Sequence, residues 1–399
     1  MPQAMRSRTA VTIGYFASFL VFGMGVAALG PALSTLAGHT GSTLSAISVV
    51  FTTSAAGYLL GSLAAATLFH RLPGHWVLGA VLALMAGLAA LIPIAAALWL
   101  LALLFFLFGV AQGIVEVGCN TLLLWVHPDH ASPYLNALHF FFGVGALLAP
   151  VGIALASSAT GDVAWFYWAF GLLVLPVAAL LLALPSPQRS AGRAAGSLVR
   201  GSAPLVMLVA AFFFLYASVE HSFGGWIPTY AEATGMAGSF GPAYFASAFW
   251  AAITAGRLLA GLATARLKPL LIVAAALAGC LISVAVVLLR PASPGVLWLG
   301  TLGLGLSLAA IVPTTLGLVG RRIGTTSQAT AVYFMGLGLG KMTMPWTIGQ
   351  LLDSAGPRSL FVVIGLVLVA ALGLFAALAA AERPASVSTF CPLDKRWKK

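Results

Sequence analysis

Long apolar stretches dominate the chain, and short polar or Gly- and Pro-containing breaks separate them. A helix needs about 20 predominantly apolar residues to cross a bilayer. Stretches of roughly that length run over 11–37, 44–69, 75–94, 96–126, 133–158, 163–185, 204–230, 240–265, 269–289, 294–319, 326–352 and 357–382. We therefore expect an all-α membrane protein with about twelve transmembrane helices. The period-two alternation typical of a membrane β-barrel strand is absent from the sequence.

One long polar break divides these stretches into two groups of six. It runs from Pro185 to Ala203 and is rich in Ser, Gly, Pro and Arg, a composition typical of a linker. The expected organisation is a six-helix bundle at 1–185, a cytoplasmic linker at 186–203, a second six-helix bundle at 204–385 and a basic cytoplasmic tail at 386–399.

The two groups repeat short glycine patterns. A Gly-x-Gly followed five positions later by Pro begins at Gly143 and again at Gly338, an offset of 195 residues (338−143). Similarly, Gly57-Tyr-Leu-Leu recurs as Gly256-Arg-Leu-Leu at an offset of 199 (256−57). Parallel six-helix repeats are typical of transporters that bind substrate between the halves, near the bilayer midplane. We therefore predict two bundles related by pseudo-two-fold symmetry.

The charge distribution places the protein in the membrane rather than on nucleic acid. Only 7% of the residues are charged and 61% are hydrophobic, whereas soluble domains are about 25% charged. The net charge of +11 arises mostly from Lys and Arg in alternate loops, and the opposite loops hold only Arg290 and Arg358. This asymmetry predicts a multi-pass protein of the cell (inner) membrane with both termini in the cytoplasm. We expect a monomer with no nucleic-acid partner.

A polar stripe interrupts the fourth apolar stretch. Gln112, Glu116 and Asn120 are four residues apart and share one helix face. A carboxylate within the bilayer costs at least about 2.5–3.5 kcal/mol unless it is protonated, paired or wet. We predict that Glu116 binds the coupling proton and that Gln112 and Asn120 contact substrate. The alternative for all three is hydrogen bonding to a neighbouring helix.

Two charged residues lie deep in the second group. Glu220 is predicted to bind substrate or to form a conformational charge pair, and it shares a face with Gly224. Gly224 and Gly225 are predicted to be gating residues that interrupt this helix beside a cavity. Lys341 lies near the middle of its stretch. It either pairs with Glu116 or Glu220 as a conformational lock or binds an anionic substrate, and we favour the lock because buried acids need partners.

The remaining candidates are aromatic and basic. Tyr244, Trp250 and Tyr333 combine flat rings with polar atoms, which suit sugar faces. Arg257 is predicted to be a gate residue that snorkels near the cytoplasmic end of its helix. The three cysteines and dispersed histidines predict no metal site, and without a Walker loop or HExxH motif we expect neither an enzyme nor a cofactor.

Three segments carry a family resemblance: Gly113-Ile-Val-Glu116-Val-Gly-Cys-Asn120, Asn136-Ala-Leu-His139-Phe-Phe-Phe-Gly143, and Glu220-His-Ser-Phe-Gly224-Gly225-Trp226. They are similar to motifs in the fourth, fifth and seventh helices of the fucose permease and sodium-dependent glucose transporter branch of the major facilitator superfamily. The resemblance extends over essentially the whole chain. It implies that the acid matching Glu116 couples protons and that the residue matching His139 lines a sugar site, with Asn136 nearby.

The sequence also departs from that branch. Fucose permease has an acidic residue in its first helix, whereas Tyr15 to Pro31 contains none. Ala149-Pro150-Val151-Gly152 partly resembles a motif of drug/proton antiporters. We therefore expect a secondary active transporter that carries a sugar or other small polar solute in symport with a proton, sodium being the other possible ion. The alternatives are a proton-driven exporter of amphipathic compounds and a membrane sensor that does not transport.

Overall fold

The computed structural model describes residues 3–128, 131–187, 203–238, 241–264, 266–323 and 327–381. The predicted basic tail at 386–399 and nearly all of the predicted linker at 186–203 lie outside these residues. The first half contains α1 (Gln3–Thr40), α2 (Leu44–Ile47), α3 (Val49–Arg71), α4 (Gly74–Leu91), η1 (Ile92–Ile94), α5 (Leu98–Val126), α6 (Ala131–Thr160) and α7 (Ala164–Ala183). The second contains α8 (Ala203–Ala233), α9 (Ala243–Thr264), α10 (Pro269–Leu289), α11 (Pro294–Leu308), α12 (Ile311–Ile323), α13 (Ser327–Ala355) and α14 (Ser359–Ala381).

Eleven of the helical segments in the described ranges are long and apolar enough to cross a membrane. They coincide with eleven of the predicted stretches, and the twelfth stretch, 326–352, corresponds to α13, which packs along α8. The predicted all-α membrane fold is therefore confirmed. The stretch at 294–319 differs in detail, because it divides into α11 and α12 at Ala309 and Ala310. Pro313 lacks the N–H that would bond to the carbonyl of Ala309, which accounts for the break.

The sequence repeat corresponds to a structural repeat. A Cβ atom on Gly145 of α6 would lie 1.9 Å from the carbonyl oxygen of Leu20 in α1. Likewise, a Cβ on Gly340 of α13 would lie 2.3 Å from the carbonyl oxygen of Phe214 in α8. Both glycines allow backbone-to-backbone packing, as small residues do in membrane helices. The helices α6 and α13 are also each followed by a glycine with positive φ, Gly161 after α6 and Gly356 after α13.

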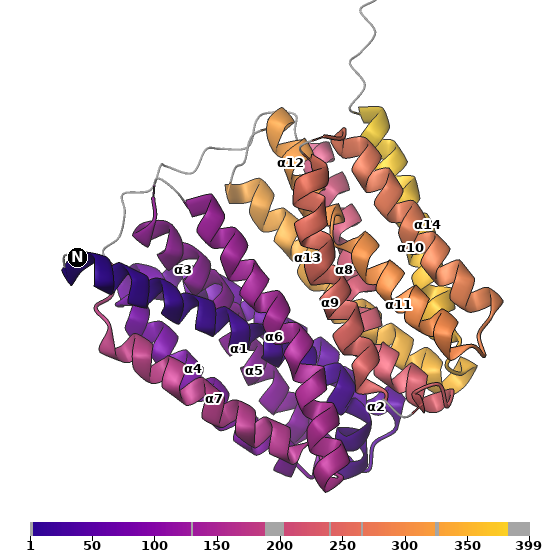
Figure 1. Ribbon diagram of the computed structural model, residues 1–399, viewed down its shortest axis with the longest axis horizontal. Coiled ribbons are helices and arrows are strands. Elements are labelled where there is room, and N and C mark those ends of the chain that lie inside the picture. Colours follow the sequence, from indigo (N-terminus) through magenta and orange to yellow (C-terminus); the bar gives the residue numbers. More distant parts are fainter. Residues whose placement is uncertain are drawn as a thin grey trace, which may run out of the picture.

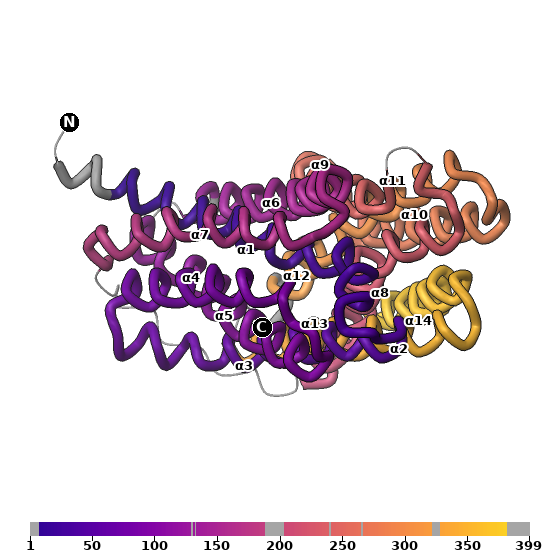
Figure 2. Tube along the Cα trace, turned by 90° about the horizontal axis from the view of Figure 1, so that it is seen from below, coloured from indigo at the N-terminus to yellow at the C-terminus, as the bar shows by residue number. Residues whose placement is uncertain are grey.

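The two halves lie side by side (Figure 1). In the view from below, α4, α5 and α7 lie on one side of the molecule and α10, α11 and α14 on the other (Figure 2). We call the interface between them the seam; it is formed by α6 against α9, α3 against α13 and α1 against α8. We call the end where α7 finishes and α8 begins the linker end, and the end that carries α2 the opposite end.

Hydrogen bonds cross the seam at the opposite end. The Oγ of Ser34 donates to Oε2 of Glu232 at 2.8 Å, and the backbone N–H of Ser45 donates to Oδ2 of Asp353 at 2.8 Å. The side-chain amide of Gln350 donates to the carbonyl oxygen of Ser45, also at 2.8 Å. These bonds join α1 and the start of the α2–α3 segment to the ends of α8 and α13.

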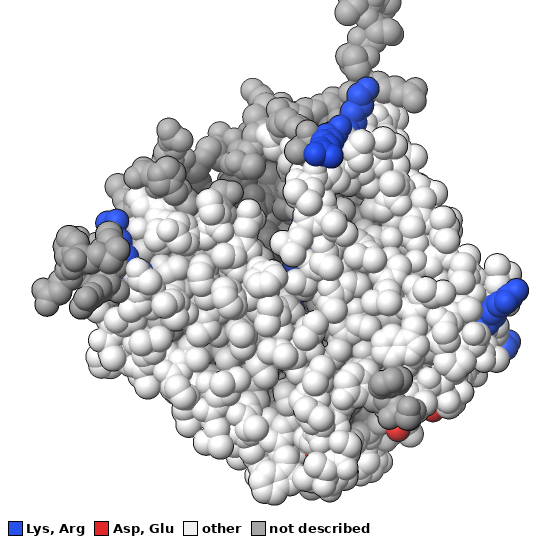
Figure 3. Space-filling view, in the orientation of Figure 1, with Lys and Arg blue, Asp and Glu red and all other residues white. Residues whose placement is uncertain are grey.

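Contacts across the seam continue as far as its middle. Phe142 of α6 faces Trp250 of α9 with 6.2 Å between ring centroids, and Ser247 donates to the carbonyl oxygen of Leu147 at 3.1 Å. Nearer the linker end, the ribbons of α3 and α6 separate from those of α9 and α12 (Figure 1). A basic side chain is visible in the furrow between the bundles (Figure 3). The described cross-seam contacts therefore concentrate in the middle and at the opposite end.

Candidate functional site

Glu116 lies in the seam-facing part of the first bundle, half-buried on α5. The hydroxyl of Tyr58 on α3 donates to its Oε2 atom at 2.5 Å. Glycines bring these helices into close contact: a Cβ on Gly113 would lie 2.3 Å from the carbonyl oxygen of Tyr58 itself. The carboxylate is therefore held by a neutral hydroxyl from the neighbouring helix.

Lys341 reaches this group from the second bundle. Its Nζ atom lies 4.5 Å from the centroid of the Tyr58 ring, a cation–π contact across the seam between α13 and α3. The predicted direct ion pair of Lys341 with Glu116 or Glu220 is not formed among the described residues: the ammonium lies over the face of the Tyr58 ring, and Arg257 pairs with Glu220. Lys341 thus contacts Glu116 only through the ring of Tyr58.

Glu220 has a different environment on α8. Its side chain is 8% exposed, and its Oε1 atom lies 3.7 Å from the guanidinium of Arg257 on α9. The hydroxyl of Tyr216, one turn earlier, donates to the same oxygen at 3.0 Å. His221 Nδ1 is 3.6 Å from Oε2. Arg257 therefore turns inward to a buried acid, and the prediction that it snorkels near the end of its helix is wrong.

His139 and Asn136 on α6 have exposed side chains. The ring of His139 packs edge-on against Phe19 of α1, with 5.5 Å between centroids. It also lies within electrostatic range of both Arg257 and Glu116. His139 therefore faces the seam, between a charged group of the first bundle and one of the second.

Gln112 and Asn120 are engaged within the first bundle. The side-chain amide of Asn120 donates to the backbone carbonyl of Glu116 at 2.8 Å. Gln112 is 5% exposed and lies against α1, since a Cβ on Gly25 would be 3.1 Å from its Nε2 atom. The Asn120 bond lies within α5 itself, whereas Gln112 packs between helices, as the alternative for this residue supposed.

Trp250 and Tyr333 are buried aromatic residues with unused donors. The indole Nε1 of Trp250 and the hydroxyl of Tyr333 have no hydrogen-bond partner in the described structure. Trp250 faces Phe142 across the seam, whereas Tyr333 packs against Phe213 inside the second bundle. Buried donors are normally paired, so the unpaired and buried N–H of Trp250 is an exception beside the seam. Tyr244, near the start of α9, is half-buried.

The predicted interruption at Gly224 and Gly225 is wrong, because α8 is continuous from Ala203 to Ala233. The two glycines serve close packing instead. A Cβ on Gly30 of α1 would lie 2.7–2.8 Å from their carbonyl oxygens, so α1 and α8 touch backbone to backbone at the seam. The close packing of α1 against this part of α8 stabilises the helical conformation of the glycine pair.

Comparison with known proteins decides the family. The sequence profile described as Major Facilitator Superfamily matches residues 13–331. The chain belongs to the Major Facilitator Superfamily. Sodium-dependent glucose transporter 1A of Mus musculus is 30% identical over 375 residues, covering 84% of this chain and 88% of the mouse protein. Sodium-dependent glucose transporter 1 of Xenopus laevis is 29% identical over 360 residues, covering 82% of this chain and 73% of the Xenopus protein.

Solved structures of the superfamily share the fold. The nucleoside transporter NupG superposes with a TM-score of 0.73 at 14% identity, covering 95% of this chain and 100% of NupG. A bacterial homologue of the human lysosomal transporter Spinster, in an inward-facing and occupied conformation, gives a TM-score of 0.74 at 14% identity. The superposition covers 95% of this chain and 97% of the homologue. This Major Facilitator Superfamily protein is therefore a transporter of small molecules rather than an enzyme.

Tyr58 is the site residue that the sequence analysis did not select. A signal for it was present in the repeat, because Gly57-Tyr58 aligns with Gly256-Arg257. In the structure both residues after the glycine contact the acid of their own bundle: Tyr58 contacts Glu116, and Arg257 contacts Glu220. Reading the repeat residue by residue would have marked Tyr58 as the counterpart of a charged candidate.

Proposed function

We propose that this transporter carries a sugar or related polar solute in symport with a cation, and that Glu116 binds the cation. The observation that carries the proposal is a set of contacts among Glu116, Tyr58 and Lys341: the Tyr58 hydroxyl donates to this acid within the membrane, and the ammonium of Lys341 lies over the Tyr58 ring and forms no ion pair with the carboxylate. A carboxylate without a direct cationic partner can take up a proton or metal cation and release it. The names of the mouse and Xenopus relatives support both the sugar and the cation coupling.

The substrate would bind in the seam beside His139. Exposed Asn136 and His139 line one side, and Trp250 offers an unpaired N–H from the other bundle. Hydroxyl groups of a sugar suit these neutral donors and acceptors, and its C–H faces suit the indole ring. The proposed site thus combines hydrogen bonding and stacking with groups from both bundles.

Coupling would follow from the position of Lys341. Neutralising Glu116 weakens its hydrogen bond with Tyr58, the residue whose ring also holds Lys341 across the seam. A change of charge on α5 then alters the contact between α3 and α13, which belong to different bundles. We propose that the linker end is cytoplasmic. The form described here, whose bundles contact each other at the opposite end, is then open to the cytoplasm. Transport would proceed as the two bundles rock about the seam.

The proton is the first candidate for the coupling ion, as Glu116 contacts a hydroxyl and its own helix rather than a set of oxygen ligands. Sodium is the second candidate, because it is the ion in the names of the relatives. The two ions are separated by imposing a pH gradient or a sodium gradient singly on proteoliposomes and measuring uptake of labelled glucose.

The test combines those gradients with Glu116→Gln. The variant is expected to lose gradient-driven accumulation and to retain exchange of labelled for unlabelled sugar, which requires no net ion movement. Asp162→Asn is the matched control, since this acid pairs with His39 away from the seam and the same change should leave accumulation intact. Normal accumulation by Glu116→Gln would refute the role of this residue, and no uptake of any sugar by the wild type would refute the substrate class.

A further inference from the structure

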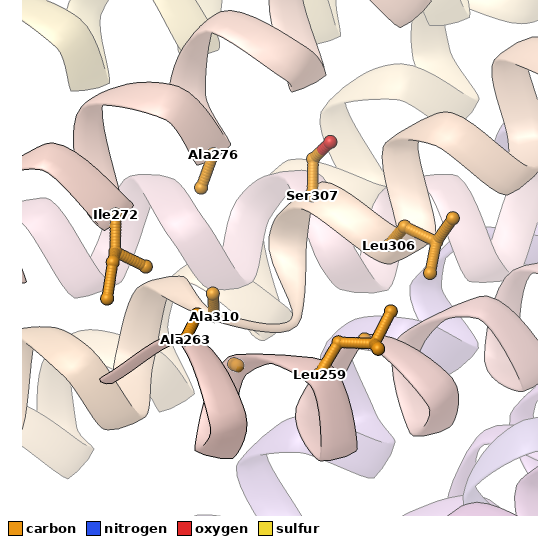
Figure 4. A pocket seen from close by; sticks show the side chains of 9 residues that line it. Leu259, Ala263, Ile272, Ala276, Leu306, Ser307 and Ala310 are labelled. Atoms are coloured by element: carbon orange, nitrogen blue, oxygen red, sulfur yellow. The ribbon is translucent and has the colours of Figure 1, made fainter. Parts of the chain in front are cut away.

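An apolar groove lies on the flank of the second bundle, apart from the seam. It is an open groove of about 270 Å³ between α9, α10 and the junction of α11 with α12. Its lining includes Leu259, Ala263, Ile272, Ala276, Leu306 and Ala310. Figure 4 shows Ile272 and Ala276 facing Leu259 and Ala263 across the open space. The groove exists because small residues line it and because α11 ends before the Pro313 break.

The groove faces the surroundings of the bundle rather than its interior. Large apolar side chains beside it are strongly exposed: Leu258 is 59% exposed, Leu262 71% and Leu271 57%. In a membrane transporter, apolar side chains exposed on the flank of a bundle contact lipid tails. An apolar chain is therefore the chemistry that fits this space.

Two basic residues stand at the mouth of the groove. The backbone N–H of Arg266 bonds to the carbonyl of Ala263 at 3.0 Å, and the carbonyl of Lys268 accepts from the N–H of Ile272 at 3.2 Å. Both side chains are exposed, and neither has an acidic partner within the described residues. Figure 3 shows Lys and Arg gathered at this end of the second bundle.

The start of α10 adds a smaller positive contribution: Pro269 has no N–H, and the N–H groups of Leu271 and Ile272 donate to the carbonyl oxygen of Lys268, so that of Leu270 remains. Lys268 is the N-cap of α10, and no side chain caps the helix start. Helix N-termini carry partial positive charge and favour phosphate. Fixed cations, an uncapped helix start and an apolar groove thus meet at one point.

We propose that this groove binds an anionic phospholipid, with one acyl chain between α9 and α10 and the phosphate on Arg266 and Lys268. From Ala263 to Gly256, the groove runs seven residues along α9, about 10 Å at 1.5 Å per residue. A second copy of the chain fits less well. Within the described ranges, the acidic residues are Glu116, Asp162, Glu220, Glu232 and Asp353, and none lies at the linker end to meet the two cations.

The lipid would act on α9, the helix that carries Arg257. Gly256 contributes to the groove lining, and Arg257 next to it pairs with Glu220 in the interior. A chain packed against one face of α9 supports the position of the ion pair on the other. The binding site stands independently of the proposed sugar and ion, since it rests only on the membrane setting.

The experiment measures lipid retention on the full-length transporter by native mass spectrometry. The probes are phosphatidylglycerol and phosphatidylcholine with identical chains, and glycerol 1-phosphate as the headgroup without a chain. Phosphatidylglycerol should be retained at least about tenfold more strongly than phosphatidylcholine. The double variant Arg266→Gln/Lys268→Gln should lose roughly 30-fold of that affinity, at about 1 kcal/mol for each basic residue. Arg290→Gln, an exposed basic residue at the opposite end of α10, should lose none.

A second variant tests the groove itself. Ala263→Phe places a ring at the half-buried mouth, and melting in lipid-free detergent reports whether it folds. It should melt as the wild type does and bind phosphatidylglycerol at least about tenfold more weakly. Equal retention of the two lipids, equal binding of glycerol 1-phosphate, an equal loss in Arg290→Gln, or full binding by a folded Ala263→Phe would each overturn the proposal. So would a dimer that the double variant abolishes, because it would assign the groove to a second copy.

Discussion

Within the described residues, each bundle contains one acid in the middle part of its membrane-spanning helices, Glu116 or Glu220, and the two acids have different partners. A tyrosine hydroxyl donates to both, at 2.5 Å to Glu116 and 3.0 Å to Glu220. Glu220 is 8% exposed and has the guanidinium of Arg257 at 3.7 Å. Glu116 is more exposed and forms no salt bridge within the described residues, and the ammonium of Lys341 contacts the ring of its partner Tyr58.

The difference arises at two positions that the repeat makes equivalent. Tyr58 and Arg257 each follow the glycine of a Gly-x-Leu-Leu segment, and each side chain reaches the acid of its bundle. A guanidinium keeps its acid charged and compensated, whereas a hydroxyl leaves the acid free to exchange a cation. We interpret the second bundle as holding a fixed ion pair and the first as holding the exchangeable site.

The strongest test of this contrast is Arg257→Gln. It leaves buried Glu220 without its cation, and breaking a buried pair costs about 3–5 kcal/mol. Because the Arg257 side chain is 33% exposed, we expect the lower end, about 3 kcal/mol, measured by unfolding in detergent. The double variant Arg257→Gln/Glu220→Gln should recover much of that stability. A double variant no more stable than Arg257→Gln alone would show that Arg257 does not compensate Glu220.

Tyr58→Phe is the corresponding test in the first bundle. It removes the hydrogen bond to Glu116, worth about 1.5–3 kcal/mol for a charged acceptor, and keeps the ring beneath Lys341. We expect a changed concentration dependence for the coupling cation, measured as uptake against external pH or sodium. Tyr58→Leu also removes the cation–π contact and should lower the free energy of unfolding by about 0.5–2 kcal/mol more. If both variants transport as the wild type does, Tyr58 has no part in coupling.

The sequence predicted those features that depend on a single helix or on the repeat. Hydropathy located the spans, and the cost of a charge in lipid marked Glu116, Glu220 and Lys341. It did not predict which of these charges would pair, because the distance from α13 to α3 depends on how each helix is rotated within its bundle. The groove was missed for a similar reason: hydropathy read 294–319 as one apolar segment, and the break follows from the hydrogen bond that Pro313 cannot make.

Lys341→Gln tests the link between the bundles and should have a smaller effect on stability. The cation–π contact that it removes is worth about 0.5–2 kcal/mol. Gradient-driven uptake should fall further than exchange, because α13 then carries no charge at this position that could respond to the state of Glu116. Combining it with Glu116→Gln should add little in the uptake assay, since both act on one chain of contacts. A defect relieved by Glu220→Gln instead would assign Lys341 to the second bundle's acid.

His139→Ala should have the smallest effect on the fold and a specific effect on substrate. The side chain is exposed in the seam, so its removal leaves no buried group unpaired, and unfolding in detergent should be unchanged. Loss of one hydrogen bond to a sugar hydroxyl would weaken binding by about 0.5–1.5 kcal/mol, measured as the concentration of glucose that half-protects the transporter against heat. His39→Ala is the matched control, because this histidine pairs with Asp162 away from the seam. Equal glucose affinity in both variants would remove His139 from the substrate site and leave the contrast between the two acids to Glu116 and Glu220 alone.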